Sequence, residues 1–418
     1  RRMFAAFSLV CVLGILVSAQ DTPKPATPDV AEQVDSINQQ ATQLEGELGK
    51  YKDSDAVAAD TMVKLVDLYH QHGRVFGLVR IAQRFVAAHA SDKRHADVML
   101  KLIDGLEATS RNADLAAACR QFLDRYGKSE QAPSVEVRLA NVLDQATDRA
   151  ASANAHRAIW QRQPQTEIGR QHGALAISHY SLVNNKAVYS KAAELADAML
   201  DKLPVGSFTE EVGSQGVAQW RRGREWAKSN IVAQKMIKKN LSRDKQRLRQ
   251  LHYYMGENYQ NLGQWANSVA SYRLARAQGD TADLHMRMIY AMYQNAATKP
   301  ADIAAQTTDY MRKYPQRIDR FTAQSYLAQV QLRGTDADKA AGLQTLKQLL
   351  PVAPRTNSNA SLFVRLSGSE PPQLAALEQS LRNAVTQSKI PYETAYIRYV
   401  LAFEVLRDRV KDPVKTKQ

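Results

Sequence analysis

The sequence predicts an all-α fold, a right-handed solenoid of antiparallel helical hairpins. Apolar residues recur with helical spacing, for example Met62, Leu65, Val66 and Tyr69 at i, i+3, i+4 and i+7, which places an apolar stripe on one side of each helix. No segment shows sustained alternation of apolar and polar residues, so β-strands are not expected. The third observation is the regular interval at which helical segments recur along the chain.

The helices that open each hairpin are expected near regularly spaced residues. These starts are Val57, His95, Ser134, Arg170, Thr209, Leu248, Asp283 and Asp319. Neighbouring starts are roughly 35 to 39 residues apart, an interval typical of solenoids in which each hairpin buries its apolar side against its neighbours. Residues 55–350 would then hold about eight to nine such hairpins.

The composition is that of a folded, basic protein. Hydrophobic residues make up 44% of the 418 residues and charged residues 23%, which excludes a disordered chain. The formal net charge of +14 favours association with acidic partners or polyanions.

Residues 1–19 resemble a secretory signal peptide, because a basic start, an apolar run and small residues follow one another. Two arginines precede an apolar run from Met3 to Val17, and Ala19 ends a site suited to cleavage. The run is shorter than the ~20 residues that cross a bilayer. We therefore expect cleavage and export to the periplasm or the extracellular space, with an uncleaved membrane anchor as the alternative.

The segments that flank the predicted solenoid have their own composition. Residues 20–54 begin with a proline-rich stretch and are expected to form a tether and an initial helix. Residues 351–373 are rich in Pro, Ser and Asn and are predicted to form a loop. Residues 374–418 are predicted to form C-terminal capping helices. The last of these carries an aromatic stripe that we interpret as its core side: Tyr392, Tyr396, Tyr399, Phe403 and Leu406.

Cleavage after Ala19 would leave Cys119 as the single cysteine, so the mature fold would contain no internal disulfide. Because Cys119 lies in an apolar helical segment, it is expected to be a small core residue.

The segment from Leu251 to Asp280 resembles a tetratricopeptide repeat. The positions that match the family pattern are Met255, Gly256, Tyr259, Gly263, Trp265, Ser268, Tyr272 and Ala275. Small residues at 256 and 268 allow two helices to approach closely, the tyrosines fill the space between them, and Gly263 turns the chain. The segment departs from the pattern at His252, where an aromatic residue is usual, and at Asp280, which replaces the closing proline.

Other segments resemble the family less closely. The stretch "FLDRYGKSEQAPSVEVRLA" is similar to repeats of bacterial envelope proteins, with Gly127 in place of the usual proline. The resemblance implies a scaffold in the cell envelope that binds another protein, with an acidic or extended peptide as the expected ligand and association with an envelope surface as a further option.

The segment Arg221–Arg249 holds most of the excess positive charge. It contains eleven Lys or Arg residues against Glu225 and Asp244. If a single helix ran through it, several of these cations would lie on one side and could bind an acidic protein or polymer. A solvated helical face is the alternative interpretation. The candidate binding residues are Arg221, Arg222, Arg224, Lys228, Lys235, Lys238, Lys239, Arg247 and Arg249.

Motifs for catalysis, cofactors and metals are missing from the sequence. There is no HExxH, paired CxxC, GxSxG or phosphate-binding glycine loop. His172 and His179 lie two turns apart on one predicted helix. The sequence therefore predicts a protein that is not an enzyme, with no cofactor, no metal and, if it is exported, no nucleic-acid partner. Two alternatives stay open: the helical part of a larger envelope enzyme, and a binder of acidic polymers through residues 221–249.

Overall fold

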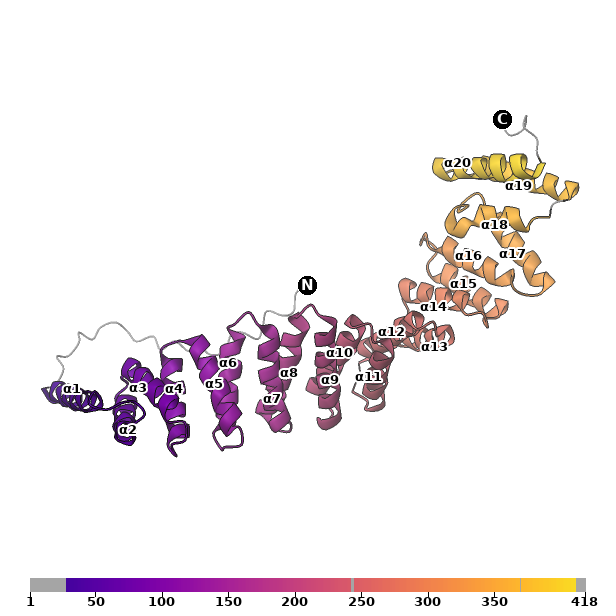
Figure 1. Ribbon diagram of the computed structural model, residues 1–418. Helices are drawn as coiled ribbons and strands as arrows, with labels where there is room; N and C mark the ends of the chain where they lie inside the picture. Colours follow the sequence, from indigo (N-terminus) through magenta and orange to yellow (C-terminus); the bar gives the residue numbers. More distant parts are fainter. Residues whose placement is uncertain (1–27, 242–243, 369, 411–418) are drawn as a thin grey trace. The chain divides into compact units, whose positions relative to one another are not determined.

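The computed structural model describes residues 28–241, 244–368 and 370–410 (Figure 1). Every regular element in these ranges is helical, which confirms the predicted all-α class. The predicted signal peptide and the proline-rich stretch lie outside the described residues. Among the helices described, none combines the length and the apolar character that crossing a membrane requires.

The chain divides into two compact units, Arg1–Thr147 and Asp148–Gln418. The boundary falls between α6 and α7, so the two helices of the hairpin expected at Ser134 belong to different units. The helices of unit 1 are α1 (Pro28–Leu48), α2 (Ala56–Gln71), α3 (Val75–Ala88), α4 (His95–Ala108), α5 (Asn112–Tyr126) and α6 (Ala132–Asp144).

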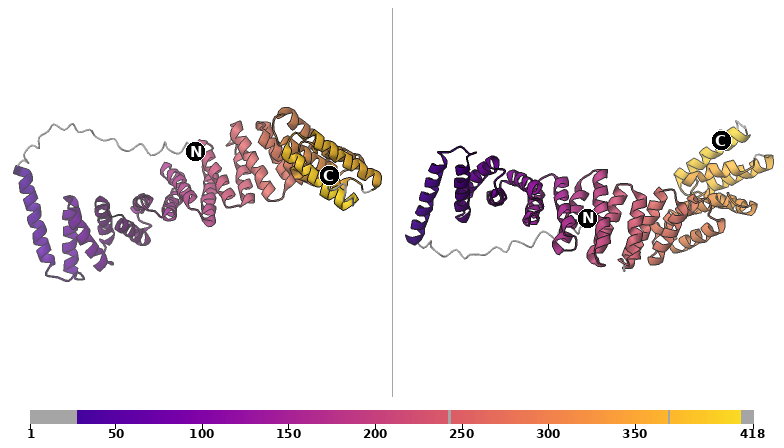
Figure 2. Two further views of the ribbon diagram at one scale, coloured as in Figure 1. Left: turned by 90° about the horizontal axis from the view of Figure 1, so that it is seen from above. Right: turned by 60° about the horizontal axis from the view of Figure 1, so that its bottom comes forward.

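Unit 2 continues the alternation of first and second helices. Its hairpin helices are α7 (Arg149–Arg162), α8 (Glu167–Leu182), α9 (Lys186–Lys202), α10 (Ser207–Arg222), α11 (Trp226–Lys238), α12 (Lys245–Asn261), α13 (Trp265–Gln278), α14 (Ala282–Gln294), α15 (Pro300–Lys313), α16 (Arg320–Gln331) and α17 (Asp336–Leu349). Each helix packs on the next one in the chain, and first helices such as α14 and α16 also contact each other (Figures 1 and 2).

The observed helix starts agree closely with the predicted interval. The first helices α2, α4, α8, α10, α12, α14 and α16 all begin within a few residues of the predicted positions. The core of unit 1 includes Met62, Leu65, Ile103 and Phe122, which are all fully buried. Cys119 is also buried there, and burial raises the pKa of its thiol to about 12, so the thiol is unreactive.

The hairpin of α12 and α13 shows why small residues are needed where helices meet. A Cβ atom added at Gly256 would lie 2.5 Å from Cε1 of Tyr272, a fully buried side chain. Ser268 is also buried, and its hydroxyl donates a 2.9 Å hydrogen bond to the carbonyl of Gly256. Gly263 forms the turn with φ of +69°, a conformation that favours glycine.

The other residues of the repeat pattern are buried to different degrees, the small one fully and the large ones in part. Ala275 is fully buried beside Tyr272 in the core. Tyr259 and Trp265 are only partly buried, and the Trp265 ring meets the ring of Tyr290 on the next first helix edge-on at 6.1 Å. The hairpin therefore has the geometry of a tetratricopeptide-like repeat.

Two predictions for the C-terminal part are wrong. The segment 351–373 is not a loop throughout, because it contains η1 (Thr356–Ser358), α18 (Asn359–Leu366) and the start of α19 (Pro371–Gln387). Buried Asn359 stabilises this structure by donating to the carbonyl of Ala353 at 2.9 Å. The Pro, Ser and Asn content of the segment predicted a loop, but α18 buries Ala360, Phe363 and Val364 in the C-terminal core.

The aromatic stripe of the last helix is not its core side. In α20 (Pro391–Tyr399) and the π-helical η2 (Val400–Val410), the side buried against α18 and α19 carries Ile397, Val400 and Val405. Leu406 is buried as predicted, whereas Tyr392 is 65% and Tyr399 52% exposed. Aliphatic residues fill the core, Tyr396 packs against its edge, and the rings of Tyr392, Tyr399 and Phe403 are exposed.

We expect Gly256→Ala to destabilise unit 2 by about 1–3 kcal/mol, because one added methyl group must displace the buried Tyr272 ring or separate α12 from α13. The four tryptophans, at 160, 220, 226 and 265, all lie in unit 2. Tryptophan fluorescence during urea unfolding therefore reports on this unit alone. Gly206→Ala is the control, because a Cβ there would meet nothing within 4 Å. Equal stability of the Gly256→Ala variant and the wild type would contradict the predicted close contact.

Candidate interaction surface

The basic segment does not form one helix. The chain leaves the helical conformation after Arg222 and again after Lys238, with positive φ angles at Arg224 (60°) and Asn240 (53°). The single basic face that the sequence suggested is therefore wrong, because α10, α11 and α12 each carry part of the segment.

Many of the predicted binding cations already have partners within unit 2. Lys235 lies 2.5 Å from Asp197 and 2.9 Å from Asp201 on α9. Lys239 donates to the carbonyl of Leu200 at 2.6 Å, and Arg222 to that of Ser181 at 2.9 Å. These contacts join neighbouring hairpins, so the cations contribute to the packing of the repeats.

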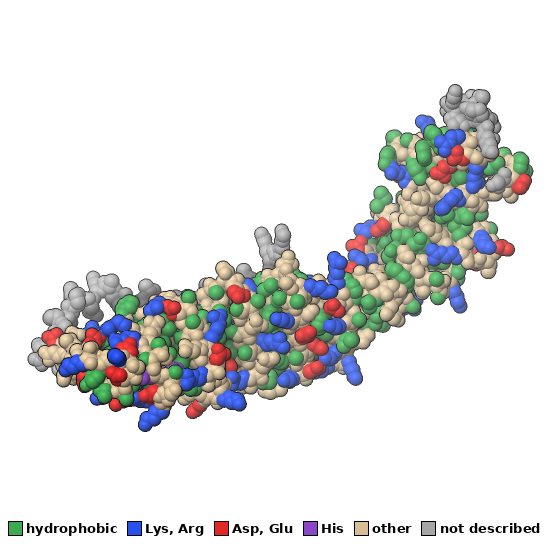
Figure 3. Space-filling model, viewed as in Figure 1, with side chains coloured by type: hydrophobic (Ala, Val, Ile, Leu, Met, Phe, Trp, Pro, Cys, Tyr) green, Lys and Arg blue, Asp and Glu red, His purple; other side chains and the backbone are tan. Residues whose placement is uncertain are grey.

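The other members of the predicted set are dispersed. Arg247 lies 3.6 Å from Glu210, Lys228 lies over the Trp220 ring, and Arg249 is partly buried. Arg224 and Lys238 are exposed. Basic and acidic side chains are interspersed over the face shown in Figure 3.

The first helices of unit 1 are joined by ion pairs that recur at one spacing. Lys101 on α4 lies 2.6 Å from Asp67 on α2, and His70 contacts Asp104 at 3.0 Å. Both pairs, like that of Arg138 with Asp104, join residues 34 apart. Equivalent positions of successive helices thus carry polar side chains that pair with each other across hairpins.

The corresponding helices of unit 2 present tyrosines and arginines instead. On α10 the Arg221 guanidinium lies 4.1 Å from the centroid of the Tyr254 ring and 2.7 Å from Glu257 on α12. Arg287 on α14 approaches the same Glu257 at 2.9 Å. Tyr253 donates a hydrogen bond to Glu257, and burial together with this bond raises the pKa of Tyr253 to about 12.

The same arrangement continues onto α16. The Tyr293 and Tyr326 rings stack with centroids 4.5 Å apart, and the centroid of the Tyr290 ring lies 5.7 Å from that of the Tyr326 ring. Arg333 covers Tyr293 with its guanidinium 5.1 Å from the ring centroid. We define the tyrosine–arginine surface as Arg221, Tyr253, Tyr254, Glu257, Arg287, Tyr290, Tyr293, Tyr326 and Arg333.

Sequence reasoning included only Arg221 of this surface. The tyrosines resembled ordinary packing residues, because aromatic residues at helical spacing normally belong to a core. This surface could be recognised only by comparing residues about one repeat apart in the sequence, because such residues become neighbours when first helices pack side by side.

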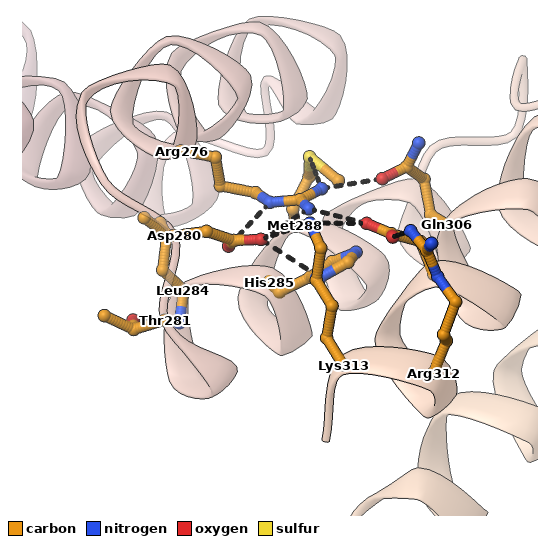
Figure 4. Close-up of polar contacts among 10 residues, drawn as sticks. Arg276, Asp280, Thr281, Leu284, His285, Met288, Gln306, Arg312 and Lys313 are labelled. Atoms are coloured by element: carbon orange, nitrogen blue, oxygen red, sulfur yellow. Dashed lines mark hydrogen bonds and ion pairs between the residues drawn. The ribbon is translucent and has the colours of Figure 1, made fainter. Parts of the chain in front are cut away.

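A second group of charged residues lies between α13, α14 and α15 (Figure 4). Arg276 contacts Asp280 through two hydrogen bonds of 2.8 Å and lies 3.2 Å from Asp309. Lys313 reaches the same carboxylates at 3.2 and 2.9 Å. Burial opposes ionisation of Asp280, but its hydrogen bonds from Arg276 and Lys313 lower its pKa.

His285 faces this cluster and is fully buried. Its Nδ1 atom lies 3.7 Å from Asp280, and neither ring nitrogen makes a hydrogen bond. With Asp280 and Asp309 it could surround a cation, but Arg276 and Lys313 already supply the positive charge that the two carboxylates require. The residues present do not favour a metal ion here.

The three histidines of α7 and α8 also meet. His156 lies 2.7 Å from His172 between their Nδ1 atoms, and its ring stacks on that of His179 with centroids 5.4 Å apart. The sequence placed His172 and His179 two turns apart on one helix but could not show that His156 contacts both.

Comparisons with known proteins found similar solved structures but no matching family. No protein-family model and no curated protein matches the sequence. Among solved structures, a tetratricopeptide repeat protein from Parabacteroides merdae matches with TM-score 0.27 and 10% identity, covering 65% of this chain and 98% of that chain. The fold itself is defined by the hairpins of this chain, in which Gly256 meets Tyr272.

Two further structures are similar in the same way. The Naa15/Naa10 complex bound to HypK-THB matches with TM-score 0.35 and 14% identity, covering 93% of this chain and 66% of that chain. The TPR2AB domain of yeast Sti1 in complex with pHSP90 matches with TM-score 0.26 and 9% identity, covering 66% and 99%.

We expect unit 2 to lose stability in acid because of His285. Burial and the nearby Arg276 lower its pKa from 6.5 to about 4. Since the folded pKa lies below the unfolded one, the stabilising contribution is complete above pH 6.5 and is lost as the pH falls towards 4. His285→Phe should reduce the decrease in unfolding free energy between pH 7 and pH 4.5 by about 2 kcal/mol.

The measurement is urea unfolding of wild type and variant across this pH range, followed by tryptophan fluorescence. Phenylalanine preserves the ring that contacts Tyr310 edge-on at 5.4 Å, so the two proteins can be compared at pH 7 first. An identical pH dependence in both proteins would show that His285 does not titrate as its burial implies.

Proposed function

We propose that this protein is a scaffold that binds another protein through the tyrosine–arginine surface. The observation that carries the proposal is the row of partly exposed tyrosines along the first helices α12, α14 and α16, covered at intervals by arginines, among them Arg221 from α10. Tyr and Arg are enriched among the residues that dominate binding energy, because they offer large contact areas with oriented polar groups. Helical repeats present such rows as extended surfaces.

The charge of the surface favours an acidic, extended segment of the partner. Arg221 and Arg287 share one carboxylate, that of Glu257, and the Arg287 side chain is 44% exposed. Arg333 is exposed and donates to the carbonyl of Tyr293 at 3.1 Å. A peptide with carboxylates between aromatic or aliphatic residues would pair with the free donors and lie on the rings.

The first test measures peptide binding with a charge-reversed surface. We expect fluorescently labelled acidic peptides that contain Tyr or Phe to bind wild type, and Arg287→Glu with Arg333→Glu to weaken binding by about tenfold or more. Peptides with Lys in place of Glu should not bind wild type, and should bind the charge-reversed variant better than wild type, because its two glutamates attract their ammonium groups.

The matched control is Lys238→Glu with Lys347→Glu, which changes the net charge equally at exposed sites outside this surface. Equal weakening by both double variants would show that net charge, and not the tyrosine–arginine surface, determines binding.

We further propose that the protein is exported and acts in the cell envelope, as either a periplasmic or an extracellular protein. The proposal is supported by the order of charge, apolar run and cleavage site in residues 1–19. Expressed in a bacterium, the protein should be recovered outside the cytoplasm with a mass that corresponds to cleavage after Ala19. Leu13→Arg should keep it in the cytoplasm with its full mass. An uncleaved wild-type protein in the cytoplasm would contradict export.

A further inference from the structure

The C-terminal helices expose a continuous row of aromatic side chains. Tyr392 is 65%, Tyr399 52% and Phe403 40% exposed. The ring centroids of Tyr396 and Tyr399 lie 6.4 Å apart, and those of Tyr399 and Phe403 5.0 Å apart. We define the aromatic end face as Tyr392, Tyr396, Tyr399 and Phe403 with the flanking Arg355, Arg407 and Asp408.

Both ends of this row carry an arginine. The Arg355 guanidinium lies 4.1 Å from the Tyr392 ring centroid and 5.5 Å from that of Tyr396. At the other end, Arg407 lies 5.0 Å from the Phe403 ring centroid. Arg407 is held by Asp408 through hydrogen bonds of 2.6 and 3.1 Å, whereas no carboxylate of the described residues pairs with Arg355.

Tyr392, Tyr399 and Phe403 are exposed, whereas Tyr396 between them is partly buried against the core of its own unit. The opposite side of α20 and η2 packs on α18 and α19 through Ile397, Val400 and Val405, all fully buried. α19 and α20 pack side by side (Figure 1). Neighbouring aromatic side chains that are exposed together indicate an interaction site.

We propose that the aromatic end face binds the same face of a second copy of the chain, with the two α20–η2 helices antiparallel. A two-fold axis near Tyr399 places the Tyr392 end of one helix opposite the Arg407–Asp408 end of the other. Arg355, which lies over Tyr392, then meets the carboxylate of Asp408 in the second copy. The same pairing occurs twice, so the Asp408 carboxylate of each copy is shared between its own Arg407 and Arg355 of the other copy, and the rings of the two copies stack.

The area of the exposed rings limits how tightly two copies of the chain can associate. From the exposed fractions, the rings contribute on the order of 300 Å² per copy. With the flanking charged side chains, the total approaches about 1,000 Å², near the lower limit for specific association. The dimer should therefore be reversible, with a dissociation constant of roughly 1–100 µM.

Sedimentation velocity of the full chain from about 1 to 300 µM tests the proposal directly. Wild type should change from monomer to dimer over this range, and Tyr399→Glu with Phe403→Glu should remain monomeric. The control is Phe76→Glu with Ile318→Glu, which removes two side chains that are 79% and 83% exposed elsewhere. This control should dimerise like wild type. Wild type that stays monomeric at every concentration would overturn the proposal.

A charge exchange tests the antiparallel arrangement without removing rings. Arg355→Glu alone should raise the dimer dissociation constant by about tenfold, because two ion pairs become repulsive contacts. Adding Asp408→Arg should restore dimerisation, since both pairs return with reversed charges. If Arg355→Glu has no effect, or if the second change restores nothing, the proposed antiparallel pairing is wrong. Far-ultraviolet circular dichroism and tryptophan fluorescence confirm that each variant is folded.

Discussion

Each unit of this protein depends on contacts in which a large side chain of one helix packs against a small residue of its neighbour. Tyr272 lies against Gly256, and Met236 lies against Gly213, where an added Cβ would be only 2.8 Å from its sulfur. In unit 1, Val79 lies equally close to the Cβ position of Gly105. Such contacts join helices that follow each other in the chain, both within a hairpin, as for Gly256 and Tyr272, and between hairpins, as for Gly105 and Val79.

This constraint explains what the sequence could predict. The helix starts were predictable, because packing against a neighbour imposes helical spacing on apolar residues such as Met62 and Leu65. The partners of polar residues were not, because Lys235 and Asp197 meet only after α9 and α11 are packed together. The aromatic row of α20 has helical spacing too, but periodicity cannot tell which of two apolar sides is buried. Ile397, Val400 and Val405 form the second apolar side and fill the core.

The same structural position has different chemistry in the two units. In unit 1, equivalent residues of successive first helices form ion pairs such as Asp67–Lys101, so a partner gains little from charge there without breaking existing pairs. In unit 2, the equivalent helices carry tyrosines: the rings of Tyr293 and Tyr326 stack, and the Arg221 guanidinium lies over the Tyr254 ring. Under the proposed function, a partner would add hydrogen bonds and ring contacts at Arg287 and Arg333, which are exposed.

Packing and binding use separate residues in this architecture, and this separation limits what a repeat pattern can reveal. Substituting Gly256 changes the distance between two helices, whereas substituting Arg287 changes only what the exposed surface offers to a partner. The pattern that identifies the hairpins is made of the first kind of residue. Specificity for a partner resides in the second kind, which is constrained only by solvent and by neighbouring repeats. Under the proposed function, the specificity of unit 2 resides in the tyrosine–arginine surface, whose tyrosines are partly buried and whose Arg287 and Arg333 are exposed.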